Sequence, residues 1–222
     1  MGATRRTILM GLSALLPAGL AGPALAQNRG VEVKKIFPFL DLYLGIPANQ
    51  RSLFTLAYFL KLNGGPPKGI SLTLVSGGAR TPITVAGDGR ITRLPTLAEL
   101  KSKAQVEIEA PPNSKFAMTM QLLAKVAPAK EIPAAQLTAA IDQCAQTIKS
   151  KAGLIGFAAP KIKRVGFVGA GSGTAVNAQG VAKPLPTGKD GPQFDPEQMP
   201  GIVTIRLARV PTMIALLERP KK

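Results

Sequence analysis

The ten residues LFTLAYFLKL, from Leu53 to Leu62, carry apolar side chains at almost every position. Successive side chains of a β-strand point to opposite faces, so this segment is apolar on both. A strand of this kind is typical of the centre of a fold, where both faces are covered. The even-numbered face holds Phe54, Leu56, Tyr58, Leu60 and Leu62, and the opposite face holds Leu53, Ala57 and Phe59.

Shorter alternating segments surround this strand in the first half of the chain. From Lys115 to Lys125, one face carries Phe116, Met118, Met120, Leu122 and Ala124. Segments 70–74 and 105–109 alternate in the same way, and clusters of Gly, Pro and Asn separate the segments at 63–67, 76–78, 87–89 and 111–113. Short strands with regularly spaced turn signals predict an antiparallel β-sandwich over residues 27–127.

A local resemblance supports this prediction. Asp88-Gly89-Arg90, followed by Leu94-Pro95, resembles the hairpin of secreted transthyretin-like and immunoglobulin-like sandwiches. The resemblance covers less than half of the chain, concerns the fold only and implies no functional site. The Cys-Trp-Cys core of true immunoglobulin domains is absent from this sequence.

The second half, residues 128–222, predicts one amphipathic helix packed on a small antiparallel sheet. Pro133 suits the first helical turn and Gly153 suits a C-terminal stop. Between them, one apolar stripe is formed by Leu137, Ile141, Cys144, Ile148 and Ala152. Four strands are expected at Val165–Val168, Ala175–Asn177, Ile202–Leu207 and Thr212–Leu217. Residues 183–201 contain five Pro and three Gly without periodicity and predict a surface loop. The expected class is therefore α+β, dominated by strands.

Residues 1–26 have the pattern of a cleaved signal peptide. Arg5 and Arg6 precede a short apolar run, and Ala24 and Ala26 form the small-x-small pattern that signal peptidase recognises. The segment Thr4 to Leu9 resembles a twin-arginine export signal, although an ordinary secretory signal can also begin with two Arg. Either route predicts a bacterial periplasmic protein. The apolar run is too short to cross a bilayer, so no transmembrane segment is expected in the mature chain.

The composition excludes several chemistries. Without His and with a single Cys, the chain can form no Ser-His-Asp triad, no Cys-His dyad, no His/Cys metal site and no internal disulfide. The run Gly169 to Gly173 lacks the third Gly of a dinucleotide fingerprint, because Thr174 stands at that position, and it predicts a hairpin turn. No catalytic, cofactor or metal residue is therefore expected, and the chain is predicted not to be an enzyme.

Three remaining groups have structural interpretations that compete with functional ones. Glu107 and Glu109 share one face of a predicted strand, and they are expected to be its solvated side rather than an acid-base pair. Asp190, Asp195 and Glu197 could supply oxygen ligands to a cation such as Ca²⁺, but loop charges in solvent are the preferred interpretation. Cys144 lies on the helix's apolar stripe and is expected to pack as a small hydrophobic residue.

The strongest global signal is charge. The chain has 28 Lys and Arg against 12 Asp and Glu, a net charge of +16. Removal of the leader, with two Arg and no acid, would leave about +14. The expected contacts with an anionic surface are Lys161, Lys163, Arg164, Arg206 and Arg209. Scarce aromatic residues argue against a nucleic-acid partner. Alternatively, the spread charge only maintains solubility.

Three functions are therefore considered. The first is a non-catalytic binding or structural module that contacts an envelope protein or an anionic envelope surface such as phospholipid or lipopolysaccharide. The second is a periplasmic carrier that holds an apolar ligand or lipid between the helix and its sheet. The third is a hydrolase that works without His. The first is the prediction.

Overall fold

The computed structural model describes residues 30–151 and 160–219. Every strand pair whose register is described is antiparallel. The predicted strand-dominated α+β class is therefore confirmed. The predicted signal residues Arg5, Arg6, Ala24 and Ala26 and the predicted helix stop Gly153 lie outside the described residues.

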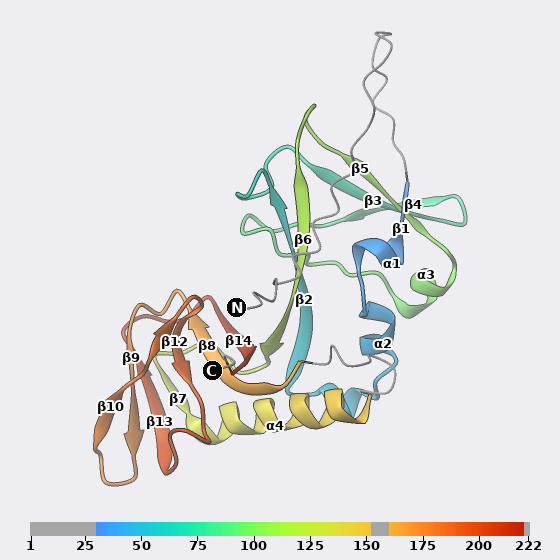
Figure 1. Ribbon diagram of the computed structural model, residues 1–222. Helices are drawn as coiled ribbons and strands as arrows, with labels where there is room; N and C mark the ends of the chain where they lie inside the picture. Colours follow the sequence, from blue (N-terminus) through green and yellow to red (C-terminus); the bar gives the residue numbers. More distant parts are fainter. Residues whose placement is uncertain (1–29, 152–159, 220–222) are drawn as a thin grey trace, which may run out of the picture. The chain divides into compact units, whose positions relative to one another are not determined.

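The chain forms two compact units. Among the described residues, the first unit holds 30–41 and 58–119. Its elements are β1 (Val31–Glu32), α1 (Val33–Ile36), β3 (Ser71–Ser76), β4 (Ala79–Ile83), α3 (Leu97–Lys101) and β5 (Gln105–Glu109). The strands form a four-stranded sheet in the order β1-β5-β3-β4 (Figure 1).

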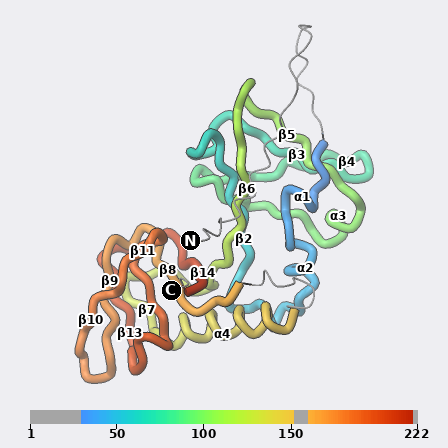
Figure 2. The backbone as a smooth tube through the Cα atoms, in the orientation of Figure 1, coloured from blue at the N-terminus to red at the C-terminus, as the bar shows by residue number. Residues whose placement is uncertain are grey.

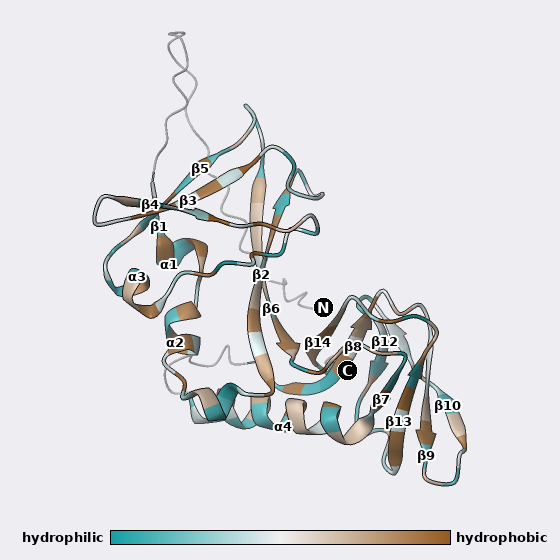
Figure 3. Cartoon of the chain, turned by 180° about the vertical axis from the view of Figure 1, so that it is seen from behind, coloured by the Kyte–Doolittle hydropathy of each residue, from teal (hydrophilic) through white to brown (hydrophobic). Residues whose placement is uncertain are grey.

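Strands β2 (Phe54–Leu62) and β6 (Phe116–Ala124) contribute residues to both units, as does the short helix α2 (Leu40–Leu44). The prediction that both faces of this strand are covered is confirmed, because β2 buries residues of both faces from Phe54 to Leu60 and exposes Lys61. In the sheet order, however, β2 is the last strand, next to β6. Figure 3 shows apolar residues along much of this strand. On β6 the predicted apolar face is only partly buried, since Phe116 and Met120 are 42% and 45% exposed.

Both edges of β2 are hydrogen-bonded within the first unit. The N–H of Leu60 donates to Gly89 O at 2.7 Å, and the N–H of Ile91 donates to Tyr58 O at 2.8 Å. On the other edge, the N–H of Asn63 donates to Lys115 O at 2.7 Å. The tight turn at 86–90, predicted from Asp88-Gly89-Arg90, therefore aligns the segment 84–92 with β2.

Tyr58 is one of the fully buried core residues of the first unit. It is completely buried, and its ring meets the edge of Phe37 with 5.1 Å between centroids. Its hydroxyl donates to Pro38 O at 2.5 Å. Burial, with a smaller contribution from Asp41, raises the pKa of Tyr58 well above its usual value. The group is therefore a neutral hydrogen-bond donor within the core.

The short helices of the first half are not among the sequence predictions. Helix α3 begins with a capping box, in which Glu99 N–H donates to Thr96 Oγ1 and Thr96 N–H donates to the Glu99 carboxylate. The pattern Thr-x-x-Glu before Leu100 is a known signal of a helix start. A single helical turn is too short for the periodicity on which the sequence analysis relied.

The second unit holds residues 42–57 and the described part of 120–222. Its helices are η1 (Ala48–Arg51) and α4 (Ala134–Ser150). Its strands are β7 (Glu131–Pro133), β8 (Ile162–Val168), β9 (Gly173–Asn177), β10 (Ala182–Pro184), β11 (Thr187–Gly188), β12 (Gly191–Phe194), β13 (Ile202–Leu207) and β14 (Met213–Glu218). One sheet has the order β10-β9-β13-β7, and another has the order β11-β12-β8-β14-β6-β2. Figure 2 shows β8 beside β14, which lies far from it in the sequence.

Helix α4 covers strands of both sheets of this unit. It packs against β7, β8 and β13. Of its predicted apolar stripe, Leu137, Ile141 and Cys144 are buried and Ile148 is half-buried, while Ala152 is outside the described residues. Pro133 is the N-cap residue, one position before the first helical turn. The predicted amphipathic helix is thus confirmed over Ala134–Ser150.

Polar side chains of α4 also hold the segment 49–53. Gln143 accepts from Leu53 N–H at 2.8 Å and donates to Asn49 O at 3.0 Å. Thr147 donates its hydroxyl to Gln50 O at 2.8 Å. These contacts place residues that the sequence analysis assigned to the N-terminal sandwich in the second unit. The two compact units therefore do not coincide with the predicted ranges 27–127 and 128–222.

Three local expectations in the second half differ from the structure. The predicted loop 183–201 contains β11 and β12, and β12 pairs with β8. The turn at 169–173 joins strands of different sheets instead of forming a hairpin. On β13, Ile205 and Leu207 are buried as expected, whereas Val203 is 47% exposed because the pairing register with β9 shifts between Ile202 and Thr204.

Within the described residues, no helix is both long enough and apolar enough to span a membrane.

We predict that Gly89→Ala destabilises the protein by about 2 kcal/mol or more. Gly89 has φ +90°, and a Cβ atom there would lie 2.2 Å from Leu60 O. Equilibrium urea unfolding would measure the change. The matched control is Gly87→Ala, where a Cβ would meet nothing within 4 Å. Equal stability of both variants would contradict the role of Gly89 against β2.

Candidate functional site

The candidate site of the sequence analysis begins where β8 begins. Lys161, Lys163 and Arg164 lie at that end of the strand, next to Glu218 at the end of β14, because Glu218 pairs with Ile162. The backbone N–H of Lys161 donates to the Glu218 carboxylate at 2.8 Å. The structure therefore brings these three predicted cations together, and it also brings acidic groups to them.

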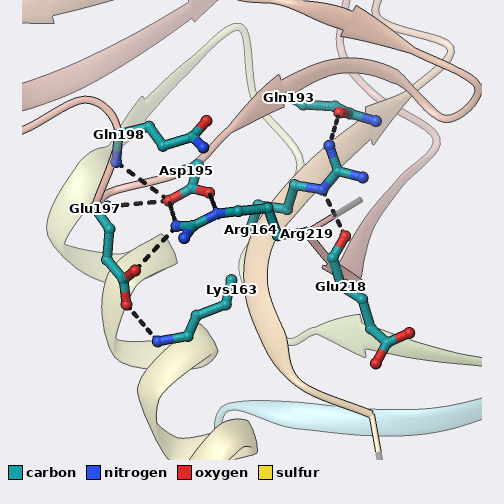
Figure 4. Close-up of polar contacts among 8 residues, drawn as sticks. All are labelled: Lys163, Arg164, Gln193, Asp195, Glu197, Gln198, Glu218 and Arg219. Atoms are coloured by element: carbon teal, nitrogen blue, oxygen red, sulfur yellow. Dashed lines mark hydrogen bonds and ion pairs between the residues drawn. The ribbon is translucent and has the colours of Figure 1, made fainter. Parts of the chain in front are cut away.

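A buried carboxylate is the centre of this region. Asp195 follows β12, and its side chain is only 7% exposed. Arg219 donates two hydrogen bonds to this carboxylate, from Nε to Oδ2 at 2.7 Å and from Nη2 to Oδ1 at 2.8 Å. Backbone N–H groups of Glu197 and Gln198 donate to the same carboxylate at 3.1 and 3.3 Å (Figure 4). A two-point contact between guanidinium and carboxylate fixes orientation as well as charge.

Glu197 extends the cluster toward β8. Its carboxylate accepts from Arg219 Nη2 at 3.0 Å and from Lys163 Nζ (Figure 4). The hydrogen bonds from Lys163 and then Arg219 hold the pKa of Glu197 below its usual value. The hydrogen bonds that Arg219 donates, first to Asp195 and then to Glu197, raise the pKa of Arg219. Two carboxylates and two cations thus neutralise one another. We call Lys163, Asp195, Glu197 and Arg219 the ion-pair cluster.

The Arg164 side chain is also engaged in hydrogen bonds within the protein. Its Nε donates to Glu218 O at 2.7 Å, and its Nη1 donates to Gln193 Oε1 at 2.5 Å (Figure 4). Gln193 is 7% exposed, so this hydrogen bond satisfies a buried amide oxygen. Arg164 therefore has a structural role that limits its availability to a partner.

The two predicted cations of β13 and its following turn differ from each other. Arg206 pairs with Glu131 on the neighbouring strand β7 at 2.7 Å, and both side chains are more than half exposed. Arg209 is exposed, and its guanidinium lies near Gly171, where a Cβ atom would be 3.1 Å from Nη2. Within the described residues, neither Arg209 nor Lys161 has an acidic side chain as an ion-pair partner.

The other groups considered in the sequence analysis, Glu107, Glu109 and Cys144, lie where their predicted structural interpretations place them. Glu107 and Glu109 lie on one face of β5, as expected. Arg80 donates to both oxygens of Glu107, and this contact lowers the carboxyl pKa of Glu107. Cys144 is fully buried, and burial raises its pKa to about 12, which keeps the thiol protonated and unreactive.

Asp195 corrects the expectation of solvated loop charge for segment 183–201, whereas the Glu197 side chain is 51% exposed. Asp195 is buried and engaged by Arg219, so its oxygens serve an ion pair and a backbone turn. No group of three or more His, Cys, Asp or Glu side chains in the described ranges is arranged to hold a metal ion. The ion-pair cluster joins the ends of β8, β12 and β14. Its carboxylates accept hydrogen bonds from its cations.

Sequence reasoning did not identify Arg219 or Gln193 as partners in this region. Asp195-Pro196 is a recognisable turn start, because Asp side chains often accept from backbone N–H groups two or three residues later. Arg219 follows 24 residues after Asp195, and no local pattern connects them. Only the return of β14 beside β8 brings the two side chains into contact.

Comparison with known proteins gives one match. Residues 68–168, somewhat less than half of the chain, match a family model described as a protein of unknown function (DUF2987). This range runs from the residues before β3 to the end of β8. No curated protein and no solved structure matches the chain. The comparisons therefore identify no functional family and provide no transthyretin-like match.

We predict that Asp195→Asn lowers the free energy of unfolding by about 1–3 kcal/mol. The substitution removes the negative charge that pairs with Arg219. Because a third of the Arg219 side chain is exposed, solvent screening limits the stability that this ion pair contributes. Urea unfolding would measure the change. The control is Asp142→Asn on the exposed face of α4, for which about 0.5 kcal/mol or less is expected. Comparable small changes in both variants would contradict the role of the ion-pair cluster.

We also predict a pH-dependent contribution from Glu197. Because its folded pKa lies below the usual 4.5, its ion pairs stabilise the protein fully above that value. The contribution is lost as the pH falls through the folded pKa. The difference in Tm between the wild type and Glu197→Gln should therefore be greatest near neutral pH and vanish under more acidic conditions. A difference that is constant from pH 7 to pH 3 would contradict this assignment.

Proposed function

We propose that this protein is a non-catalytic binding module that is exported to the bacterial periplasm and contacts an anionic component of the envelope. The observation that carries the proposal is a charge excess that the chain cannot neutralise internally. With a net charge of +16, the cations would outnumber the acids even if every Asp and Glu formed an ion pair. The leader accounts for only two of these charges.

The arrangement of the charges supports the same proposal. Several acidic side chains form ion pairs with cations of their own unit, as in the pairs of Asp195 with Arg219, Glu107 with Arg80 and Glu99 with Arg93. Exposed cations such as Lys161 and Arg209 are left facing solvent. Surplus positive charge of this kind attracts anionic surfaces and is screened by salt.

The surroundings of the reactive groups favour binding over catalysis. The Cys144 thiol is buried, the Tyr58 hydroxyl donates to a backbone carbonyl, and the Glu107 carboxylate is held by Arg80. Each of these groups is therefore either buried or bound by another group of the protein. The proposal includes an export signal at residues 1–26, of the twin-arginine or the ordinary secretory type. It also includes a fold of the transthyretin-like or immunoglobulin-like kind.

The test is co-sedimentation of the processed protein with lipid vesicles. Vesicles that contain phosphatidylglycerol should retain the protein at low salt, and retention should fall steeply toward an ionic strength of about 0.15 M, where the Debye length is about 8 Å. Vesicles of phosphatidylcholine alone are the control and should retain little protein. Binding that is equal on both lipids, or indifferent to salt, would contradict the electrostatic proposal.

A further inference from the structure

The first unit carries a group of cations that share one face of three neighbouring backbone segments. β2 is hydrogen-bonded to β6 on one edge and to the segment 84–92 on the other. Lys61 on β2, Arg90 in that segment and Lys115 at the start of β6 are all exposed. We call these three residues the cationic face.

The pairing register places these side chains on the same side. Asn63 donates its N–H to Lys115 O, and Lys125 donates its N–H to Leu53 O, so β2 and β6 are antiparallel with one constant register. Position 117 is therefore opposite Lys61, and position 115 lies on that same face, two residues along.

The other edge of β2 agrees with this assignment. Arg90 forms an antiparallel bridge with Phe59. Directly opposite residues of an antiparallel pair point to one face, and Lys61 follows Phe59 by two residues. Arg90 and Lys61 therefore share the face that Lys115 reaches from β6. Three segments that are distant in the sequence converge there.

Short side chains separate these cations. Ala117 and Thr119, on the same face of β6, are exposed and do not project as far as Lys or Arg. Asp88 is the acid nearest in sequence to Arg90, and its carboxylate accepts from the Arg90 backbone N–H at 3.0 Å. Within the described residues, Lys61, Arg90 and Lys115 take part in no ion pair. Their charged ends are therefore the most prominent groups of this face.

We propose that the cationic face docks on an anionic phospholipid bilayer, an inference that rests on the proposed function and locates its contact surface. Charge complementarity carries the choice of partner. Cations spread over a pleated face suit a surface of many mobile phosphate headgroups, which needs no fixed spacing between charges. Nucleic acid is a poorer fit, because the face offers no exposed aromatic ring for base stacking.

The experiment compares two triple variants of equal charge in the vesicle assay. K61Q/R90Q/K115Q removes the cationic face. K35Q/K101Q/K103Q removes three exposed cations that belong to α1, α3 and the residues after α3 instead of to β2, β6 or the segment 84–92. Each cation close to an anionic bilayer strengthens binding about fivefold, so the first variant should lose about a hundredfold in affinity. The second should lose much less. Circular dichroism and Tm should be unchanged in both.

The outcomes separate the two proposals. A third variant, K161Q/R209Q, removes two exposed cations of the second unit. Equal losses in the two triple variants, or a loss seen only in K161Q/R209Q, would overturn the cationic face while the anionic-surface function stands. Absence of wild-type binding to phosphatidylglycerol vesicles would overturn both. Inorganic phosphate should reduce binding to the vesicles no more than sodium chloride does at the same ionic strength. Stronger competition by phosphate than by chloride would indicate a site for the free anion and contradict bilayer docking.

A second measurement reports the docked surface directly. Ala117→Cys, labelled with an environment-sensitive fluorophore, should shift to the blue on phosphatidylglycerol vesicles, because this position lies between the cations. Ala98→Cys on α3 is the matched control and should not shift. The native Cys144 is buried and does not compete for the label. A shift at Ala98→Cys alone would place the bilayer on another surface.

Discussion

Backbone hydrogen bonding on both edges of β2 is the constraint that organises the first unit. A strand with two buried faces has little access to water, so its N–H and C=O groups must find partners in the chain. The segment 84–92 supplies them on one edge, and β6 supplies them on the other. Gly89 meets this requirement because its carbonyl must reach Leu60 N–H where no Cβ would fit.

The same constraint positions charge. Since β2 buries its residues up to Leu60, its first exposed cation, Lys61, follows directly after the buried run. Its neighbours on that face are set by the register with β6 and with segment 84–92. A surface of cations thus results from the pairing that completes the hydrogen bonding of a core strand. Stability and the proposed docking share one structural cause.

Acidic residues are mostly engaged in holding the protein together. In the second unit, Asp195 and Glu197 join the ends of β8, β12 and β14 through Lys163 and Arg219. Glu131 joins β7 to β13 through Arg206. Internal use of the few acids leaves the excess of cations without compensation, and an external anion is the partner that such a surface attracts.

The amino-acid sequence by itself determined the strand-dominated class, the strand at 53–62 that is buried on both faces, the helix after Pro133 and the inert position of Cys144. Each follows from side-chain periodicity or burial preference, which act between residues close in the chain. The tertiary structure alone decided which cations are paired. No sequence feature distinguished the cations Lys163, Arg164 and Arg206 from Lys161 and Arg209. In the structure, carboxylate, carbonyl and amide oxygens from distant segments accept hydrogen bonds from the first three side chains. Lys61, Arg90 and Lys115 gained a common face only through strand register. Contacts between segments tens of residues apart leave no local pattern, because they depend on how the strands return beside one another.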